Sequence, residues 1–197
     1  AVLRTDDGGA HWTRIAPSSL PRAQANEGSF AASGTCIAMH GSGRAWIVMN
    51  SPAASRLIRT VDFGRTWALE TLPITTREGS GTQSVIFRDA RHGMVLGGGY
   101  QVRQGDTLIA VTEDGGDTWV PRSAPAFKVG TWGGSWVPAA RTPTAVAVGP
   151  SGSAWTRDDG RTWVAIDTLN YWSVGFSSRR TGWAVGTQGR VTRLDGW

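Results

Sequence analysis

Short apolar segments, rich in valine, isoleucine and tryptophan, recur along the chain, and turns rich in glycine and aspartate separate them. Each segment has the length of a β-strand, and none keeps a helical period over several turns. The segments come in pairs: Phe30–Met39 with Ala45–Met49, Ser84–Arg88 with Gly93–Gly97, Ser135–Val137 with Thr144–Val148, and Ser173–Phe176 with Trp183–Val185, the last followed by Arg190–Leu194. The pattern predicts an all-β protein of short antiparallel strands.

One motif, Thr-x-Asp-x-Gly-x-x-Trp, organises these strands, because it occurs four times between two apolar segments. Its fixed positions are Thr5, Asp7, Gly9 and Trp12; Thr60, Asp62, Gly64 and Trp67; Thr112, Asp114, Gly116 and Trp119; and Thr156, Asp158, Gly160 and Trp163. The first threonines lie 55, 52 and 44 residues apart, which is close to the repeat of a propeller blade. With the upstream strand pairs, each unit has four strands, so the sequence predicts a β-propeller of four-stranded antiparallel blades.

The motif, called the box below, has a structural explanation. An aspartate in a tight turn accepts N–H bonds from the residues ahead of it, and the glycine allows a positive φ. The threonine hydroxyl can hold the other end of the loop, and the tryptophan can pack against the neighbouring blade. We therefore expect the box aspartates to be structural and not catalytic.

The blade repeats cover residues 1–16, 30–73, 83–123, 133–168 and 171–197 of a single propeller domain, or of part of one. Only the middle three are complete, so the sequence predicts three full blades and a partial blade at each end. The partial blades could complement each other into a fourth blade. We favour instead the C-terminal part of a longer propeller, because a four-bladed ring is at the low limit of known sizes.

Composition narrows the classes of function. The net charge of +5 is spread along the chain, which argues against a dedicated nucleic-acid binder. No segment is apolar for the roughly 20 residues of a membrane helix. The lone Cys36 and three scattered histidines form no zinc pattern, and Gly97-Gly98-Gly99 lacks the spacing of a dinucleotide-binding loop. We expect no metal site and no cofactor.

Loops that join one blade to the next meet near the central channel of a propeller, on the face opposite the boxes. Exposed tryptophan and arginine are typical anchors of interfaces, and the binding candidates on these loops are Arg22, Arg77, Trp132, Trp136, Tyr171 and Trp172. Glu27 and Glu78 fall in equivalent loops of neighbouring blades. They are the weak candidates for the carboxylate pair of a glycosidase, and we favour the interpretation that they are solvated loop charges.

The boxes resemble those of Asp-box (bacterial neuraminidase repeat) proteins, which include sialidases and sortilin-like receptors. Ser173-Val174-Gly175-Phe176 with Thr181-Gly182-Trp183-Ala184-Val185-Gly186 resembles the repeat of photosystem II stability/assembly factor-like propellers. Glu27–Cys36, Phe87–Gly93 and Ala147–Gly152 resemble a bacterial branch of that family, whose members are often labelled oxidoreductase or glycosyl hydrolase. The resemblance implies a propeller outside the cytoplasm, in the periplasm or secreted.

Two functions follow from this resemblance. The first is a non-enzymatic scaffold that binds a protein or peptide through its channel-face loops, as an assembly factor does. The alternative is a carbohydrate-active protein, either a glycoside hydrolase or a lectin-like sugar binder; an oxidoreductase has no chemical basis in these residues. A lectin-like site would place tryptophan beside asparagine or aspartate on the channel face.

Overall fold

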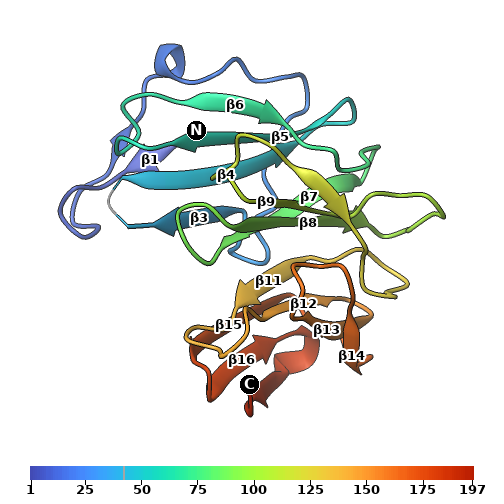
Figure 1. Ribbon diagram of the computed structural model, residues 1–197. Helices are drawn as coiled ribbons and strands as arrows, with labels where there is room; N and C mark the ends of the chain where they lie inside the picture. The colour runs from blue at the N-terminus through green and yellow to red at the C-terminus, as the bar shows by residue number, and fades with distance from the viewer. Residues whose placement is uncertain (42) are drawn as a thin grey trace.

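The computed structural model describes residues 1–41 and 43–197, and its strands form five antiparallel sheets (Figure 1). Three sheets have four strands, hydrogen-bonded in chain order. They are β3 (Ile37–His40), β4 (Arg44–Asn50), β5 (Ser55–Thr60) and β6 (Ala68–Thr71); β7 (Ser80–Phe87), β8 (Gly93–Gly99), β9 (Ile109–Thr112) and β10 (Val120–Arg122); and β11 (Gly133–Trp136), β12 (Ala145–Gly149), β13 (Gly152–Thr156) and β14 (Val164–Asp167). These are the three complete blades expected from the repeats.

The terminal sheets are smaller. A two-stranded sheet pairs β1 (Leu3–Arg4) with β2 (Thr13–Arg14), and a three-stranded sheet holds β15 (Ser173–Ser178), β16 (Thr181–Val185) and β17 (Val191–Leu194). Two short 3₁₀ turns, η1 (Pro17–Ser19) and η2 (Thr187–Gly189), are the helical elements of the described chain. The all-β fold with partial blades at both ends is therefore confirmed.

Three apolar clusters hold neighbouring blades together. The first joins β3–β6 to β7–β10 through Trp46, Val48, Leu57, Leu72, Ile74, Val85, Val95 and Ala110. Met94 and Leu96 of β8 pack with Ala145 and Ala147 of β12 in the second cluster. Val146 and Val148 of β12 pack with Val174 and Ala184 of the last sheet in the third. Alternate residues of each second strand thus face the following blade, as the period of a strand requires.

Each box closes a turn with its own atoms. In the second box, the Thr60 hydroxyl donates to Asp62 Oδ1 at 2.8 Å and accepts the Gly64 N–H at 2.9 Å, while Asp62 accepts the Thr66 N–H at 2.9 Å. The same three bonds recur in the other boxes. These bonds, with that of the Thr66 hydroxyl first, hold the pKa of Asp62 at about 2.

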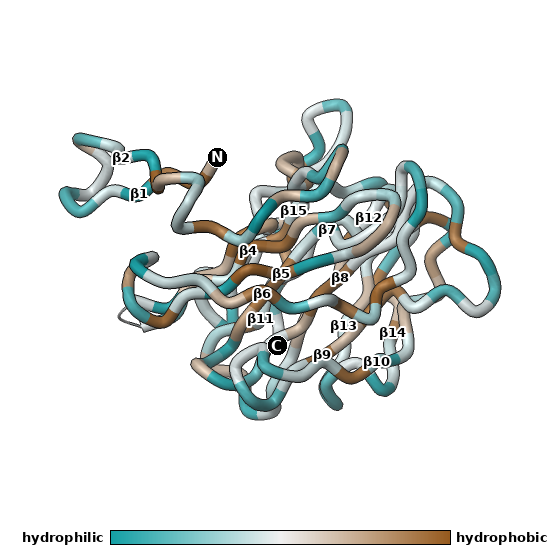
Figure 2. Tube along the Cα trace, turned by 90° about the horizontal axis from the view of Figure 1, so that it is seen from above, coloured by the Kyte–Doolittle hydropathy of each residue, from teal (hydrophilic) through white to brown (hydrophobic). Residues whose placement is uncertain are grey.

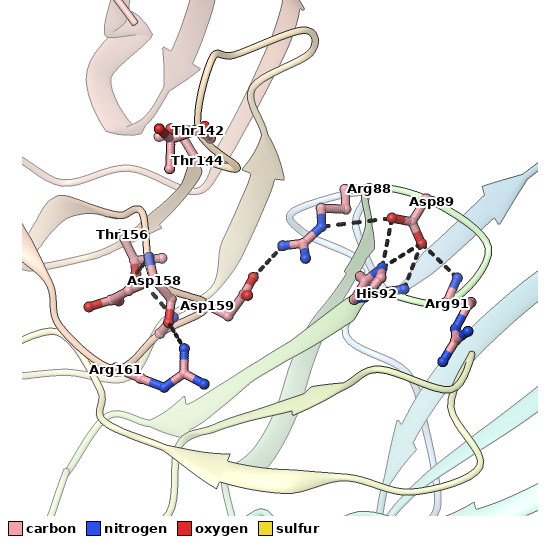
Figure 3. Close-up of polar contacts among 11 residues, drawn as sticks. Arg88, Asp89, Arg91, His92, Thr142, Thr144, Thr156, Asp158, Asp159 and Arg161 are labelled. Carbon is pink, nitrogen blue, oxygen red and sulfur yellow. Dashed lines mark hydrogen bonds and ion pairs between the residues drawn. The ribbon is translucent and has the colours of Figure 1, made fainter.

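The second, third and fourth boxes are also bonded to the unit before them. Arg4 donates to the Phe63 carbonyl at 3.2 Å, and Arg59 forms an ion pair with Asp117 of the third box. Figure 3 shows the equivalent contact at the fourth box, where Arg88, from the turn after β7, pairs with Asp159. The boxes therefore link consecutive units through hydrogen bonds and ion pairs, in addition to closing their own turns.

The first partial blade, β1–β2, stands away from the body of the molecule (Figure 2). Within the described chain, its two strands pair with each other and with no strand of β15–β17. The alternative in which the terminal pieces complement each other into a fourth blade is therefore wrong for this structure, because β1 lies beside the second box through Arg4.

The inner strand of the first full blade is shorter than expected. The sequence predicts a strand over Phe30–Met39, whereas β3 covers only Ile37–His40. Residues 30–36 instead form a turn-rich segment, in which Gly34 donates to Ala31 and the Phe30 ring packs on Trp132. This departure from the strand brings Phe30 to the channel face.

Candidate functional site

The channel-face loops enclose a pocket of about 320 Å³. Three complete blades contribute to it, through the segment before β3, the ends of β4 and β8, the start of β7 and the segment before β11. Its lining residues are Asn26, Gly28, Ser29, Phe30, Asn50, Gly79, Gln83, Gly99, Tyr100 and Trp132.

Glycines position the wall of the pocket that carries Trp132. The Gly130 N–H donates to the Gly99 carbonyl at 2.8 Å, and the Thr131 hydroxyl donates to the Gly97 carbonyl at 2.9 Å. Gly98 has a φ of +118°, and a Cβ there would lie 2.6 Å from the Gly130 Cα. The Gly97-Gly98-Gly99 run thus serves the close approach of two backbones.

Three aromatic rings pack against Trp132, which is 5% exposed. Its ring centroid lies 5.5 Å from Phe30, 5.4 Å from Tyr100 and 5.2 Å from Trp172, and the last two contacts are edge-on. Tyr100 is 73% exposed and Trp172 is 37% exposed. Trp132 is therefore the buried centre of the cluster, and Tyr100 and Trp172 present its accessible rings.

Gln83 is a polar residue of the pocket wall that the sequence analysis did not single out. It is the extra residue of a β-bulge, since the register of β7 on β8 shifts between Thr82 and Ser84. Gln83 is 8% exposed, and its Nε2 donates to the Gly98 carbonyl at 3.1 Å. Its Oε1 is buried, and no hydrogen-bond partner for it lies among the residues described. The neighbouring Thr82 and Ser84 are polar as well, so the sequence carried no signal that singled out Gln83.

The two candidate carboxylates do not form a catalytic pair. Glu27 accepts hydrogen bonds from Arg56 Nε at 2.6 Å and Nη2 at 2.5 Å, and both side chains are at least nine-tenths buried. Glu78 is exposed on the segment before β7. Glu27 is thus committed to a structural ion pair, because Arg56 of β5 lies directly beneath its loop.

The two candidate arginines differ in their surroundings. Arg77 forms a two-point ion pair with Asp106, whose hydrogen bond raises the pKa of the guanidinium and lowers that of the carboxyl. Arg22 is exposed, and its carbonyl accepts Arg56 Nη2 at 3.0 Å. Of the two, only Arg22 presents a guanidinium at the surface.

Tyr171 lies in the core, although the sequence placed it among the binding residues. It is fully buried, and its hydroxyl donates to Asp167 Oδ2 at 3.0 Å and lies 3.0 Å from Thr192 Oγ1. Burial raises the pKa of its hydroxyl. Tyr171, two residues before β15, faces inward here, so it is not available to a ligand.

Trp136 lies at the wrong end of its strand for a channel-face residue. It is the last residue of β11, and it lines a second hollow of about 440 Å³ on the box face. The Arg88 guanidinium lies 4.9 Å from its ring centroid, and the same arginine pairs with Asp159 (Figure 3). The four residues of β11 run from the channel face to the box face of the propeller, so Trp136, the last of them, lies on the box face.

No three His, Cys, Asp or Glu side chains of the described chain gather as a metal site. Among the same residues, no helix has the length and apolar character needed to cross a membrane.

Neither a protein-family model nor a curated protein sequence matches the chain. The solved structures that are similar to it include the following two. The chain superposes on YCF48 bound to D1 peptide with a TM-score of 0.58 and 19% identity, over 86% of this chain and 54% of that one. It superposes on the GH74 xyloglucanase from Xanthomonas campestris with a TM-score of 0.61 and 18% identity, over 96% of this chain and 32% of that one.

The chain has a β-propeller fold. At these identities the likeness shows the fold alone, and it agrees with the resemblance to photosystem II stability/assembly factor-like propellers. The chain spans about half the length of the YCF48 chain and a third of the xyloglucanase.

Proposed function

We propose that this propeller is a non-enzymatic scaffold that binds a peptide or protein partner at the channel-face pocket. The observation that carries the proposal is the aromatic cluster, in which the buried Trp132 and the exposed Tyr100 line the pocket and the exposed Trp172 packs edge-on against Trp132. Aromatic anchors of this kind dominate binding energy at protein interfaces. The similar YCF48 structure, which is bound to a D1 peptide, supports the same use of the fold.

The surrounding charges favour binding over hydrolysis. Glu27 and Asp106, the carboxylates beside the pocket, are each neutralised by an arginine. A glycosidase needs two carboxyl groups free to exchange protons with the substrate. The proposal therefore excludes a hydrolytic role for Glu27, and it leaves Glu78 as a solvated loop charge.

A sugar-binding role is the second candidate, because Asn26 and Asn50 line the same pocket as Trp132. Asparagine beside tryptophan is the combination expected of a lectin-like site, and the similarity to a xyloglucanase structure agrees with it. The two candidates differ in the ligand that they predict, so one experiment separates them.

The experiment screens the purified chain against a phage-displayed library of random dodecapeptides, the D1 peptide and a glycan array. Tyr100→Ala and Trp172→Ala should each weaken peptide binding by at least about tenfold, the usual loss for an aromatic anchor. Trp12→Ala is the matched control, because Trp12 is 59% exposed on the distant β1–β2 hairpin. Capture of glycans alone, with the same dependence on Tyr100, would favour the sugar-binding role.

A location outside the cytoplasm belongs to this proposal as well, and it rests on the resemblance to Asp-box proteins. Fractionation of cells that express the natural gene, followed by detection of the protein in the periplasm or medium, tests it. Recovery in the cytoplasm alone would contradict it.

A further inference from the structure

Gln83 is the one pocket-lining residue of the described chain whose side chain is buried with half of its hydrogen-bonding capacity unused. The bond from Nε2 to the Gly98 carbonyl fixes which end of the amide is which, because only the nitrogen can donate. The other polar atom of the amide, Oε1, accepts no hydrogen bond from the described residues. Buried acceptors are rarely left in this state, and an exception calls for a physical reason.

The bulge in β7 explains why the side chain is at the pocket. A bulge inserts one residue into a strand and redirects its side chain, and such bulges are frequent beside functional sites. Without it, alternation along β7 would leave position 83 on a blade face. The bulge interrupts the regular pairing of β7 with β8 and places the side chain of Gln83 at the pocket wall.

The rest of the wall is uncharged. Among the described residues that line the pocket, the polar ones are amides and hydroxyls, and the others are aromatic rings or glycines. Glu27 and Arg77, on the loops that contribute to the wall, are held in ion pairs with Arg56 and Asp106, and Glu78 is exposed to solvent outside the lining. A charged ligand group would lose its hydration here without gaining a counter-charge, so the pocket selects against it.

The aromatic rings restrict the ligand further. Trp132 is covered by three neighbours and offers no open face on which a sugar ring could stack. The exposed ring of Tyr100 provides apolar surface beside it. The pocket therefore combines one buried, unpaired acceptor, Gln83 Oε1, with aromatic rings and uncharged polar groups.

We infer that the pocket takes an uncharged amide that carries an apolar or aromatic group, with Gln83 as the acceptor for the amide N–H. This inference rests on the proposed function, since it names the chemistry that the peptide-binding site would recognise. The terminal torsion of a glutamine is soft, so a small rotation turns Oε1 toward the ligand. An amide of this kind is a segment of peptide backbone with its side chain, or the side chain of asparagine or glutamine.

The test uses small probes, because these need no identified partner. Phenylacetamide and methyl phenylacetate have the same aromatic group and no charge, but only the amide has N–H donors. Binding is followed by the shifts of tryptophan indole resonances in ¹H–¹⁵N spectra. The wild-type chain should bind the amide about fivefold more tightly than the ester, the usual gain from one hydrogen bond.

Gln83→Met removes the acceptor and keeps the length of the side chain. This variant should bind both probes equally, while Gln104→Met, in the exposed loop after β8, should keep the preference for the amide. Thermal unfolding gives a second readout. Gln83→Met removes the unpaired Oε1 but also the bond from Nε2 to the Gly98 carbonyl, so the two effects oppose each other and the variant should unfold close to the temperature of the wild type.

Equal binding of the two probes by the wild type, or a preference that survives in Gln83→Met, would overturn the inference. So would an absence of shifts with both probes. The library screen reports separately on the proposed function. Peptides that need Tyr100 but tolerate Gln83→Met would leave that function standing and refute only the role of Gln83.

Discussion

The indole N–H of Trp46 donates a hydrogen bond of 2.8 Å to the carbonyl oxygen of Gly115, which lies 69 residues further along the chain. Trp46 belongs to β4, and Gly115 belongs to the box of the next blade. The Trp46 ring also stacks on Phe87, with the centroids 3.6 Å apart. The bond and the stacking explain why Trp46 is only 2% exposed, and they couple the two blades directly.

We predict that Trp46→Ala lowers the free energy of unfolding by about 3–5 kcal/mol, as truncation of a buried tryptophan does. Trp183 is the matched control, because it occupies the equivalent place in β16 but is 47% exposed. Trp183→Ala should cost less than about 1 kcal/mol, the usual loss at an exposed position. Urea unfolding of both variants measures the difference, and equal losses would contradict the role of the Gly115 bond.

The box aspartates predict a loss of stability in acid. The folded-state pKa of Asp62 is about 2, below the value of about 3.9 in an unfolded chain. A depressed pKa gives stability that is present above pH 4 and is lost as the pH falls toward 2. Hydrogen bonds from the His11 backbone, first, and side chain hold the pKa of Asp7 at about 2 as well, so both boxes act in one window.

Asp62→Asn tests this pH dependence. The variant should be less stable than the wild type at pH 6, and the two should converge near pH 2, where the carboxylate of the wild type is protonated. Arg65→Gln is the control, because Arg65 contributes only its backbone N–H to Asp62 and should leave the slope unchanged. Guanidinium titrations between pH 6 and pH 2 measure the slopes. Parallel curves for Asp62→Asn and the wild type would refute the prediction.

The buried pair Glu27–Arg56 should be a structural requirement. Glu27→Gln leaves the Arg56 charge without its counter-ion, and removal of one partner of a buried pair costs about 3–5 kcal/mol. Glu78→Gln changes an exposed side chain and should be neutral. The free energies of unfolding of the two variants settle the assignment. A neutral Glu27→Gln would show that the pair is dispensable.

Gly98→Ala should disturb the pocket itself. The new Cβ would lie 2.6 Å from the Gly130 Cα and would force a residue with a side chain to a φ of +118°. We expect a loss of more than about 2 kcal/mol and a change in the environment of Trp132. Gly105→Ala is the control for backbone strain alone, since Gly105 also has a positive φ but nothing lies within 4 Å of its Cβ position. Unfolding and indole resonances report the two effects.

The fold was predictable because each box repeats both the same residues and the same hydrogen bonds within its turn. Each copy carries the threonine, aspartate and glycine that its turn needs, so local chemistry marks the third and fourth strands of every blade. The inner strands were less certain. Phenylalanine is common in strands, but Phe30 lies outside the sheet and packs on Trp132.

The site was predicted only in outline. Trp132, Trp172 and Arg22 lie where the loop assignment places them, whereas Tyr171 turned inward and Trp136 lay at the far end of its strand. Both errors concern the direction of a side chain within one or two residues of a strand end, which sequence does not fix. Gln83 was missed because a bulge displaces it, and Glu27 was misjudged because its partner Arg56 is distant in sequence.

The bonds between the boxes and the units before them lie on the face opposite the pocket. A substitution of an exposed residue at the pocket rim therefore leaves these bonds between the units intact. This division makes the exposed side chains of the rim a surface on which recognition can diverge at little cost in folding, and it marks the exposed loop from Tyr100 to Gln104 as a place where foreign segments can be grafted.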